Sequence, residues 1–376
     1  MPSTSSNESL WAGVQRVQYP TLVGEAFADV CVVGLGGSGL VCAGELLRLG
    51  ASVIGIDAGA IGGGAGGRNG GFLLAGVAKF YHDAIDAYGR ERARQMYQLS
   101  LDEIERIAAA TPDTVSLCGS LRIADSPEEE RDCLAQVVAM RRDGLAAEAY
   151  DGAEGRGVLV PGDGAFQPLE RCASLAAAVR AAGGVLFEGS PVTRVAAGAV
   201  HTPTGVVRAK RVVVAVDGAL DLLLPELASE VRTARLQMLA TAPTTEISLT
   251  RPVYTRWGYD YWQQRPDGAI ALGGARDVGG DAEWTHDTSP TETVQRALDD
   301  RLRATLGVSA KITHRWGASV SYTKSEVPIV REVRPSVWAV GGYSGTGNVI
   351  GSLLGRGIAR LVIRGDDALL SPFLHA

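Results

Sequence analysis

Three glycines and one aspartate near the start of the chain have the spacing of a nucleotide site. Gly34, Gly36 and Gly39 follow the apolar run Val30–Val33 and fill a G-x-G-x-x-G pattern where a helix is expected to begin. Glycines allow a tight turn and a close approach of backbone to a diphosphate, whose charge the N–H groups of a helix start favour. Asp57 lies 23 residues after Gly34, near the roughly 20 residues expected for a carboxylate that binds ribose hydroxyls. The pattern predicts a dinucleotide site; a tight turn without a ligand is the alternative.

A strand, a helix and a second strand must hold these residues. The short apolar run Val30–Val33 is typical of a buried strand, the helix is expected over Ser38–Leu49, and Gly50 suits its C-terminus. The run Ser52–Ile56 then forms the second strand, which delivers Asp57. This order makes the motif more specific than the glycines alone, because a chain with 48 glycines produces chance matches.

The segment Gly59–Phe72, directly after Asp57, is dominated by glycine. Its glycines disfavour a stable helix or strand, but their amides can wrap an anionic or planar ligand. Arg68 and Asn69 are its only polar side chains. A flexible linker is the alternative, although linkers are usually rich in serine. We expect the loop to cover the same cofactor as Asp57.

A second passage from strand through glycines to helix lies near the C-terminus. The run Val337–Val340 leads into Gly341–Asn348, and a helix is expected over Val349–Ile363. No acid follows a next strand, so the ribose-binding pattern is not met. The free N–H groups of a helix start suit the polar edge of a ring. An ordinary tight turn is the alternative.

The remaining patterns divide the chain into two domains. The helix Leu169–Ala182 and the later apolar strand Arg211–Val216 return to the β-α-β order, whereas four runs between residues 232 and 273 alternate like an antiparallel sheet. We expect an α/β and α+β fold: a Rossmann-like cofactor domain of residues 25–75, 155–230 and 325–376, an inserted antiparallel-sheet substrate domain of residues 76–154 and 231–324, and a loose N-terminal arm of residues 1–24 that Trp11 could dock onto the protein.

Periodicity and capping patterns predict three helices in the inserted domain. They span Lys79–Thr111, the residues from the capping box Ser126–Glu129 to Arg142, and Thr291–Leu306 after the capping box Ser289–Glu292. In the expected strand Tyr259–Gln264, the two tyrosines share one face and Trp262 takes the other.

Composition excludes several classes of function. A formal charge of −6 without a basic tract disfavours a nucleic-acid partner. No apolar run reaches the roughly 18 residues of a membrane span, and residues 1–24 lack the apolar core of a secretory signal. The cysteines show no metal-like spacing, which favours a reducing, cytoplasmic setting and no metal chemistry. They are Cys31, Cys42, Cys118, Cys133 and Cys172.

Together these residues resemble the FAD-dependent oxidoreductases of the D-amino-acid oxidase superfamily, from Val30 to Arg364. Gly67–Gly71 and the closing Gly342–Gly347 look most like gamma-glutamylputrescine oxidase and its amine-oxidising relatives, with glycine and sarcosine oxidases in the same superfamily. Other segments that carry the resemblance are Phe166–Pro168, Arg211–Val216, Asp267–Gly274, Trp316 and Thr323–Pro328.

The resemblance implies a bound FAD. Its diphosphate would lie on the first helix, its ribose on Asp57, its isoalloxazine against Gly67–Gly71 and its N1/C2 edge at Gly345–Asn348. Neither Gly62–Phe72 nor Trp338–Gly351 contains the His or Cys that tethers FAD in some relatives, so we expect a non-covalent cofactor. The implied contacts are Gly34, Gly36, Gly37, Ser38, Gly39, Asp57, Ala58, Gly66, Gly67, Arg68, Asn69, Gly70, Gly71, Val192, Gly218, Gly342, Gly345, Thr346, Gly347 and Asn348.

The implied reaction is hydride transfer from the carbon that bears an amine to flavin N5, followed by imine hydrolysis, with O₂ or another acceptor taking the electrons. Two departures bear on it. No Arg follows Trp316 to hold a carboxylate, which favours amines over α-amino acids, although Arg256 or Arg276 could substitute. The strand Ala269–Gly273 also lacks the Lys that activates oxygen in monomeric sarcosine oxidase, so both oxidase and dehydrogenase stay open.

The sequence assigns no catalytic residue and leaves the oligomeric state open. Lys324 is expected at the surface and His314 in a strand. The alternatives are a nicotinamide-dependent dehydrogenase, a flavin-binding protein or complex subunit without turnover, and the RNA-modifying branch of the superfamily, which the acidic charge disfavours. Candidate residues of the substrate cavity are Tyr259, Tyr261, Arg276, Trp316, Tyr322 and Tyr343.

Overall fold

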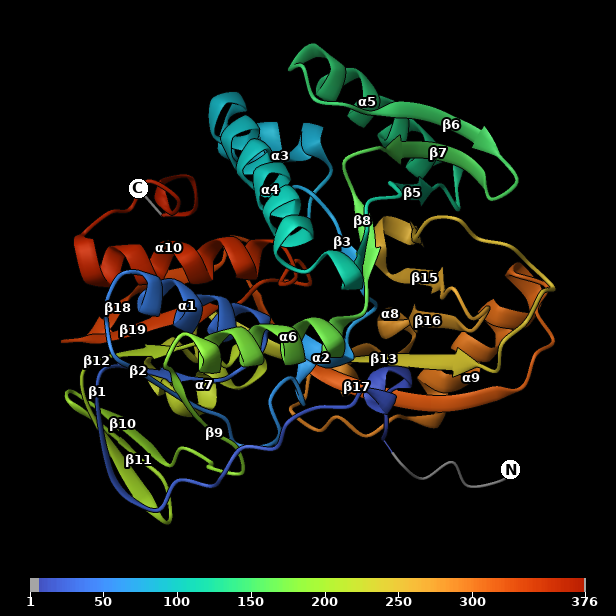
Figure 1. The fold of residues 1–376 in the computed structure, drawn as a ribbon. Coiled ribbons are helices and arrows are strands. Elements are labelled where there is room, and N and C mark those ends of the chain that lie inside the picture. Colours follow the sequence, from blue (N-terminus) through green and yellow to red (C-terminus); the bar gives the residue numbers. More distant parts are fainter. Residues whose placement is uncertain (1–6, 375–376) are drawn as a thin grey trace. The chain divides into compact units, whose positions relative to one another are not determined.

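The computed structural model describes residues 7–374 and divides the chain into two compact units (Figure 1). Unit 1 comprises the described part of Met1–Gly13 together with Asn69–Gln167 and Arg235–Ala318. Unit 2 comprises Val14–Arg68, Pro168–Ala234 and the described part of Ser319–Ala376. Two of the boundaries between the units fall within long strands, β13 (Val231–Thr241) and β17 (Ile312–Thr323). The residues expected to form one arm, 1–24, are divided between the two units at Gly13.

Unit 2 is built on a sheet with a parallel centre. Strands β9 (Val185–Phe187), β2 (Val53–Ile56), β1 (Gly24–Val33) and β12 (Gly205–Val214) lie side by side in that order and run parallel, and β19 (Val337–Gly341) pairs parallel with β12. Antiparallel strands extend it: β10 (Arg194–Ala196), β11 (Ala199–His201) and β18 (Ile329–Arg334). The helices of unit 2 are α1 (Gly37–Arg48), α2 (Ala65–Arg68), α6 (Pro168–Ala181), α7 (Leu220–Leu223) and α10 (Ile350–Arg364).

The apolar strand residues explain the parallel centre, since a parallel strand is buried on both faces. Cys31, Ile54, Val212 and Ala339 are at most 4% exposed and belong to one core cluster. Helix α1 packs against both α6 and α10 (Figure 1). The expected Rossmann-like sheet with crossing helices is therefore confirmed.

Unit 1 contains a long sheet in the order β17-β13-β16-β15-β14-β5-β7-β6. Its strands pair antiparallel from β13 to β14 and from β5 to β6, while β14 and β5 pair parallel. Its other strands are β5 (Ser120–Ile123), β6 (Glu148–Gly152), β7 (Gly155–Val160), β14 (Val253–Thr255), β15 (Asp260–Gln264) and β16 (Ile270–Gly274), and a small antiparallel sheet joins β3 (Phe72–Leu73), β8 (Gly164–Phe166) and β4 (Val115–Ser116).

The helices of unit 1 form two groups. In Figure 1, α3 and α4 lie beside each other and α3 also contacts α5, whereas α9 packs on β16. Two separate core clusters match these groups, one around Phe80 and Met140 and one around Leu239 and Leu298. The helices are α3 (Tyr81–Tyr88), α4 (Arg90–Ala110), α5 (Pro127–Arg142), α8 (Arg276–Gly279) and α9 (Glu292–Asp300), with short 3₁₀ segments that include η1 (Leu10–Gly13) and η5 (Arg256–Gly258).

The Ser126 cap of the first predicted capping box is confirmed, and the Ser289 cap of the second is wrong. The Ser126 hydroxyl accepts the N–H of Glu129 at 3.1 Å, and α5 begins at Pro127. The cap of α9 is Thr291 rather than Ser289, because α9 begins at Glu292 and Ser289 lies two residues before the cap position. The helix also changes at Asp300 into a π-helical turn, Arg301–Thr305.

Three other expectations about local structure are corrected. The helix expected over Lys79–Thr111 is two helices, broken at Gly89, whose φ of +83° a helix cannot accommodate. The loop Gly59–Phe72 contains the four-residue helix α2 despite its glycines. Tyr259 lies before β15, because Arg256 and Trp257 adopt left-handed φ values of 54° and 53° that end the preceding strand.

The described residues hold no helix that is both long and apolar enough to cross a bilayer. Residues 7–374 also contain no cluster of three or more His, Cys, Asp or Glu side chains arranged for a metal ion. All five cysteines are free thiols.

Candidate functional site

The first glycine turn of unit 2 has room for main chain only. Gly34 has a φ of +93°, and a Cβ on Gly39 would lie 1.9 Å from the Gly34 carbonyl oxygen. A Cβ on Gly66 would lie 3.0 Å from both the Gly36 Cα and the Gly37 nitrogen. Backbone from the start of α1 and from the glycine-rich loop therefore meets closely, and the donors available there are N–H groups. This donor set fits a diphosphate.

Asp57 lies at the end of β2, beside this turn. Its Oδ2 accepts the N–H of Leu35 at 2.8 Å, and its Oδ1 accepts the N–H of Gly59 at 3.0 Å. Burial is the largest influence on this carboxyl and raises its pKa, while the two N–H donors act in the opposite direction. Each carboxylate oxygen can accept a further hydrogen bond, so the position fits ribose hydroxyls.

Arg171, from α6, is a cation at the start of α1 that the sequence patterns did not indicate. Its side chain is 3% exposed, and its Nη2 donates to the Ser352 hydroxyl of α10 at 2.7 Å. A Cβ built on Gly37 would lie 3.1 Å from its Nη1. A buried guanidinium thus adjoins the same N–H groups as the glycine turn, which adds positive charge where a diphosphate would bind.

The second glycine turn is fastened to α1 by a pair of side chains. The hydroxyl oxygens of Tyr343 and Ser38 lie 2.7 Å apart, and both residues are buried. Burial raises the pKa of the Tyr343 phenol, which keeps it protonated. Ser38, a predicted cofactor contact, and Tyr343, a predicted residue of the substrate cavity, therefore lie together in unit 2.

Asp217 anchors the same turn from the other side. Its Oδ1 accepts the N–H of Gly342 at 2.8 Å and that of Tyr343 at 3.3 Å, and its Oδ2 accepts the N–H of Ser321 at 3.2 Å. Burial raises the pKa of Asp217 to about 6. Asp217 was assigned no role from the sequence, although an acid soon after an apolar strand, here β12, was the available signal.

The second glycine turn has a positive φ at three residues and is exposed to solvent at Gly345. Gly342, Ser344 and Gly345 have φ values of 70°, 51° and 92°. Gly345 is exposed, and a Cβ there would meet nothing within 4 Å. Gly345 and the half-buried residues Thr346–Asn348 lead directly into α10, whose first N–H groups are available in this region.

In unit 1, the carbonyl groups of Asn69, Gly70 and Gly71 each accept a hydrogen bond from a side chain. The Trp11 indole Nε1 donates to Asn69 O at 2.8 Å, and the Gln263 amide donates to Gly70 O and, at 3.2 Å, to Gly71 O. The Asn69 Oδ1 in turn accepts the N–H of Gly71 at 2.8 Å. Gln263 was assigned no role from the sequence, and Trp11 was expected only to dock the N-terminal arm.

Tyr261 packs into a notch made by two glycines of unit 1. A Cβ on Gly70 would lie 3.1 Å from the Tyr261 ring, and one on Gly273 would lie 2.4 Å from it. The ring also meets Phe72 edge-on, with centroids 5.9 Å apart. Of the predicted cavity residues, Tyr261 is therefore the one that the structure brings to the Asn69–Gly71 segment.

The two arginines considered as carboxylate clamps differ in their surroundings. Arg256 forms ion pairs with Asp260, at 3.0 Å, and with Asp277. The Arg276 guanidinium lies over the rings of Tyr259 and Trp284, 5.4 Å and 4.8 Å from their centroids. Arg256 is thus neutralised by two carboxylates, and Arg276 lies against two aromatic rings.

The other predicted residues lie in varied surroundings. Trp316 is fully buried in β17, and Tyr322 is half-buried on the same strand. Val192 packs on the core of unit 2, and a Cβ on Gly218 would lie 2.4 Å from Ser319 O. Ala58 is exposed and Arg68 half-buried. Lys324 is exposed and His314 lies in β17, as expected.

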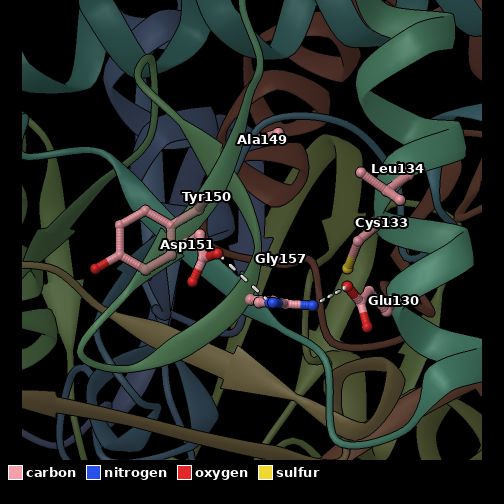
Figure 2. A pocket seen from close by; sticks show the side chains of 8 residues that line it. Glu130, Cys133, Leu134, Ala149, Tyr150, Asp151 and Gly157 are labelled. Carbon is pink, nitrogen blue, oxygen red and sulfur yellow. Dashed lines mark hydrogen bonds and ion pairs between the residues drawn. The ribbon is translucent and has the colours of Figure 1, made fainter.

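A pocket of about 260 Å³ lies elsewhere in unit 1, between α5 and the hairpin β6–β7 (Figure 2). Glu130 and Asp151 flank Arg156 there, each 3.5 Å from its guanidinium. None of the residues predicted from the sequence lines this pocket.

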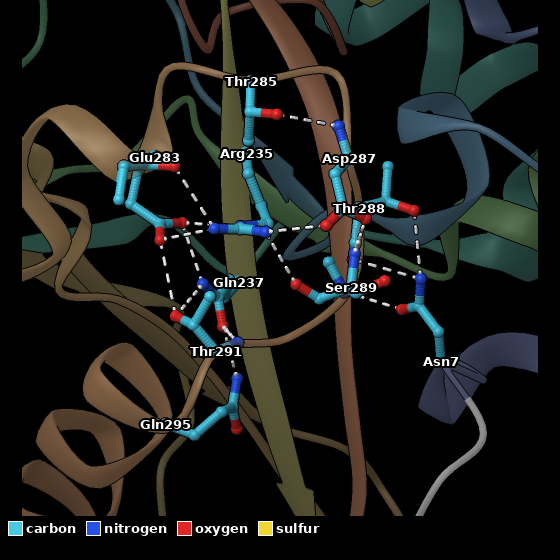
Figure 3. Close-up of polar contacts among 12 residues, drawn as sticks. Asn7, Arg235, Gln237, Glu283, Thr285, Asp287, Thr288, Ser289, Thr291 and Gln295 are labelled. Carbon is cyan, nitrogen blue, oxygen red and sulfur yellow. Dashed lines mark hydrogen bonds and ion pairs between the residues drawn. The ribbon is translucent and has the colours of Figure 1, made fainter.

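A buried polar network stiffens β13 in unit 1 (Figure 3). Arg235 donates to both carboxylate oxygens of Glu283, at 2.9 Å and 2.8 Å, and Gln237 donates to the same carboxylate. Arg235 is 5% and Glu283 1% exposed in their side chains. Since the charges and donors satisfy one another, this network is structural.

A family model described as FAD dependent oxidoreductase matches residues 29–361. The chain belongs to this family. It is therefore an FAD-dependent oxidoreductase, as the resemblance in the sequence implied, and FAD rather than a nicotinamide is its cofactor. The matched span contains both glycine turns and Asp57, whose donors and space fit FAD.

Two similar proteins cover almost all of the chain. The gamma-glutamylputrescine oxidoreductase of Escherichia coli is 30% identical, over 95% of this chain and 88% of that protein. The probable oxidoreductase OrdL of Rhizobium meliloti is 27% identical, over 93% and 86%.

Solved structures share the fold of this FAD-dependent oxidoreductase. The glycine oxidase of Bacillus cereus has a TM-score of 0.76 at 18% identity, over 93% of this chain and 99% of that one. The L-proline dehydrogenase of P. horikoshii has a TM-score of 0.75 at 18% identity, over 95% and 98%.

Proposed function

We propose that this FAD-dependent oxidoreductase oxidises the C–N bond of an amine. The observation that carries the proposal is the 30% identity, over 95% of the chain, to a protein named gamma-glutamylputrescine oxidoreductase. The carbon that bears the amine loses a hydride and the resulting imine takes up water, which yields a carbonyl compound and a released amine. When bound, FAD supplies the acceptor for the hydride.

We propose that unit 2 is the FAD-binding domain and that its main chain carries most of the binding. The amides at Gly34–Gly39 and the Arg171 guanidinium would face the diphosphate, and Asp57 would accept ribose hydroxyls. The N–H groups of Gly345–Asn348 would stabilise negative charge at the ring edge, since a helix start carries partial positive charge. We propose that the other FAD contacts implied by the family resemblance also contact the cofactor.

We propose that unit 1 carries the substrate. Tyr261 packs on Gly70 and is the aromatic side chain that would border the donor carbon. The amine must bind as the neutral base, because an ammonium ion is a poor hydride donor. A water molecule or a tyrosine hydroxyl could accept its proton.

Three arginines of unit 1 are paired with carboxylates of the protein, which favours amines over α-amino acids as substrates. Arg235 is bound by Glu283, Arg256 by Asp260 and Asp277, and Arg315 pairs with Asp299 at 2.8 Å. A second candidate substrate, an amine that also bears a carboxylate, is favoured by Arg276, whose position over two aromatic rings suits a planar anion.

We also propose a non-covalent flavin, because the two glycine segments lack His and Cys, and a reducing, cytoplasmic location, which the five free thiols favour. Acid treatment should release the yellow colour into the supernatant. Colour that stays with the precipitate would contradict non-covalent binding.

Anaerobic reduction of the holoenzyme tests the reaction. Putrescine, gamma-glutamylputrescine, N-methyl amino acids, glycine and D-amino acids are mixed with the oxidised protein side by side, and bleaching of the flavin band is recorded. The proposal expects bleaching by the amines. Bleaching by none would leave a flavin protein without amine turnover, and comparison of O₂ with an artificial acceptor separates oxidase from dehydrogenase.

A further inference from the structure

A turn of unit 1 holds three successive residues in the left-handed region of the backbone. Arg256, Trp257 and Gly258 have φ values of 54°, 53° and 89°. Glycine adopts such values readily, but the other two residues are strained there. Strain of this kind persists only where surrounding contacts hold the backbone, and it is frequent at ligand clamps and active sites. The contacts that hold this turn therefore indicate what the strain serves.

Glu129, in the first turn of α5, holds this turn with both oxygens of its carboxylate. Its Oε2 accepts the N–H of Arg256 at 3.1 Å, its Oε1 accepts the N–H of Trp257 at 2.7 Å, and the residue is fully buried. The same Oε2 accepts the N–H of Asp125 at 2.9 Å. The Trp257 indole adds a hydrogen bond from its Nε1 to Asp132 Oδ2 at 2.8 Å. One end of α5 therefore fixes both strained peptide N–H groups.

Asp260, at the start of β15, connects this turn to another left-handed residue. Its Oδ1 accepts the N–H of Ala275, whose φ is 52°, at 2.9 Å. Its Oδ2 pairs with Arg256 at 3.0 Å and with Arg301 at 2.7 Å, and Asp260 is 2% exposed. Ala275 immediately precedes α8, whose first residue is Arg276. The two strained parts of the backbone thus meet at one buried carboxylate.

The strained segments place two side chains against each other at the surface of unit 1. Tyr259 follows the first strained turn and Arg276 follows Ala275, and the Arg276 guanidinium lies 5.4 Å from the centre of the Tyr259 ring. The ring of Trp284 lies 4.8 Å from the same guanidinium. Tyr259 is 38% exposed, and the other two side chains are half-buried, so a dissolved ligand can reach them. A guanidinium against aromatic faces keeps its N–H donors in its own plane, which matches the two oxygens of a carboxylate.

We propose that Glu129 is a positioning residue for a carboxylate site of unit 1. By holding the strained turn, Glu129 sets the place of the Tyr259 ring against the Arg276 guanidinium, and these two side chains bind the carboxylate together with Trp284. The inference rests on the second substrate class of the proposed function, an amine that bears a carboxylate. It gives the acid in the first turn of α5 a role in the selection of the substrate.

The test measures the binding of glutarate, a dicarboxylate without an amine, to the full-length holoprotein by isothermal titration calorimetry. Glu129→Gln keeps one oxygen but turns an NH₂ group toward a backbone N–H. It should raise the Kd for glutarate roughly tenfold and accelerate hydrogen–deuterium exchange in the peptide that covers residues 254–261. Glu130→Gln, on the same helix, is the matched control, since Glu130 lies 3.5 Å from Arg156 and not at the turn. E130Q should keep the wild-type values.

Trp257→Gly adds a rescue that separates a held turn from general stability. Glycine accepts the left-handed φ of this position, so E129Q/W257G should bind glutarate with a Kd within about threefold of that of W257G. A general loss of stability in E129Q would not be rescued in this way. Asp132→Asn keeps every contact of Glu129 and loses the indole contact alone. It should raise the Kd roughly two- to threefold, which decides the role of the turn if E129Q does not fold.

Three results would overturn the inference. They are equal glutarate affinities of E129Q and E130Q, an unchanged affinity in Arg276→Ala, and a wild-type protein that does not bind glutarate. Glutarate binding requires no amine oxidation. A protein whose flavin no amine reduces would therefore refute the proposed reaction, while the glutarate affinities would still decide the role of Glu129.

Discussion

The hydroxyl oxygen of Tyr343 lies 2.7 Å from that of Ser38, across 305 residues of sequence. The helices that these residues adjoin also meet through main chain, since a Cβ on Gly355 of α10 would lie 2.4 Å from the Ser38 carbonyl oxygen. The two glycine turns of unit 2 are therefore parts of one closely packed body.

Tyr343→Phe should separate the hydrogen bond from the packing. The ring stays and the hydroxyl is lost, so we expect the free energy of unfolding to fall by about 1 kcal/mol and FAD to dissociate more readily. Urea denaturation and flavin titration measure the two effects. Ser38→Ala should give a similar loss, and the double variant should cost less than the sum of both. Additive losses would show that the hydroxyls are not coupled.

Gly66→Ala should disrupt the close backbone contact between the glycine-rich loop and the start of α1, whereas Gly64→Ala should not. The new Cβ at Gly66 would lie 3.0 Å from backbone atoms of Gly36 and Gly37, whereas one at Gly64 would meet nothing within 4 Å. We expect G66A to be purified with little FAD and to lose about 1–3 kcal/mol of stability. Flavin-to-protein absorbance ratios of purified G66A and G64A test this, and equal ratios would contradict it.

Arg171→Met should weaken FAD binding by loss of charge beside Gly37. Loss of one charge-assisted contact predicts a Kd roughly tenfold higher, measured by quenching of FAD fluorescence on addition of apoprotein. Arg180→Met, on the exposed face of the same helix, is the matched control. An unchanged Kd for R171M would remove Arg171 from the diphosphate site.

Asp163 should make stability fall as the pH rises. It is 2% exposed, its Oδ1 accepts the N–H of Ala75 and its Oδ2 the hydroxyl of Ser120, and burial raises its pKa to about 7. The folded state then holds this proton more tightly than the unfolded state, so its contribution is most favourable below about pH 4 and declines as the pH passes through 7.

Asp163→Asn isolates this contribution, since the amide can accept from Ala75 and donate to Ser120. Relative to wild type, D163N should gain roughly 2 kcal/mol between pH 5 and pH 8. Urea denaturation of both proteins across this range gives the difference. A constant difference would mean that Asp163 is not titrating there.

Arg276→Ala should discriminate between the two substrate classes. If Arg276 binds a carboxylate, KM for carboxylate-bearing amines should rise roughly tenfold or more, while KM for simple diamines stays unchanged. Arg256→Ala is less suited to the comparison, because it would break the ion pairs with Asp260 and Asp277. Equal effects of R276A on both classes would exclude a carboxylate contact.

Local patterns predicted the elements whose signals lie within one stretch of chain. The turn at Gly34–Gly39, the strand that ends before Asp57 and the cap at Ser126 depend on neighbours a few residues away. Ser289 failed as a cap because the helix begins at Glu292, which makes Thr291 the cap. The apolar periodicity on both sides of Gly89 predicted one continuous helix. The positive φ of Gly89 interrupts that helix.

The site was predicted less completely than the fold. Glycine motifs indicated where main chain approaches a ligand, but Arg171 and Trp11 reach Gly37 and Asn69 only through folding, and no spacing in the sequence relates them. Asp217 could have been recognised as a candidate site residue, because an acid after an apolar strand is the same pattern that indicated Asp57. Arg256 and Arg276 were equivalent candidates in the sequence, because residue type alone does not show that Arg256 forms ion pairs with Asp260 and Asp277.

The order in which unit 2 is assembled has a consequence for biosynthesis. Its parallel sheet places β1 against β12, and β12 against β19, from three stretches that the ribosome produces far apart in time. Helix α10, which packs on α1, is translated only after β12 and β19. A nascent chain that carries the first glycine motif alone thus lacks the second glycine turn, so cofactor capture has to wait for these later segments.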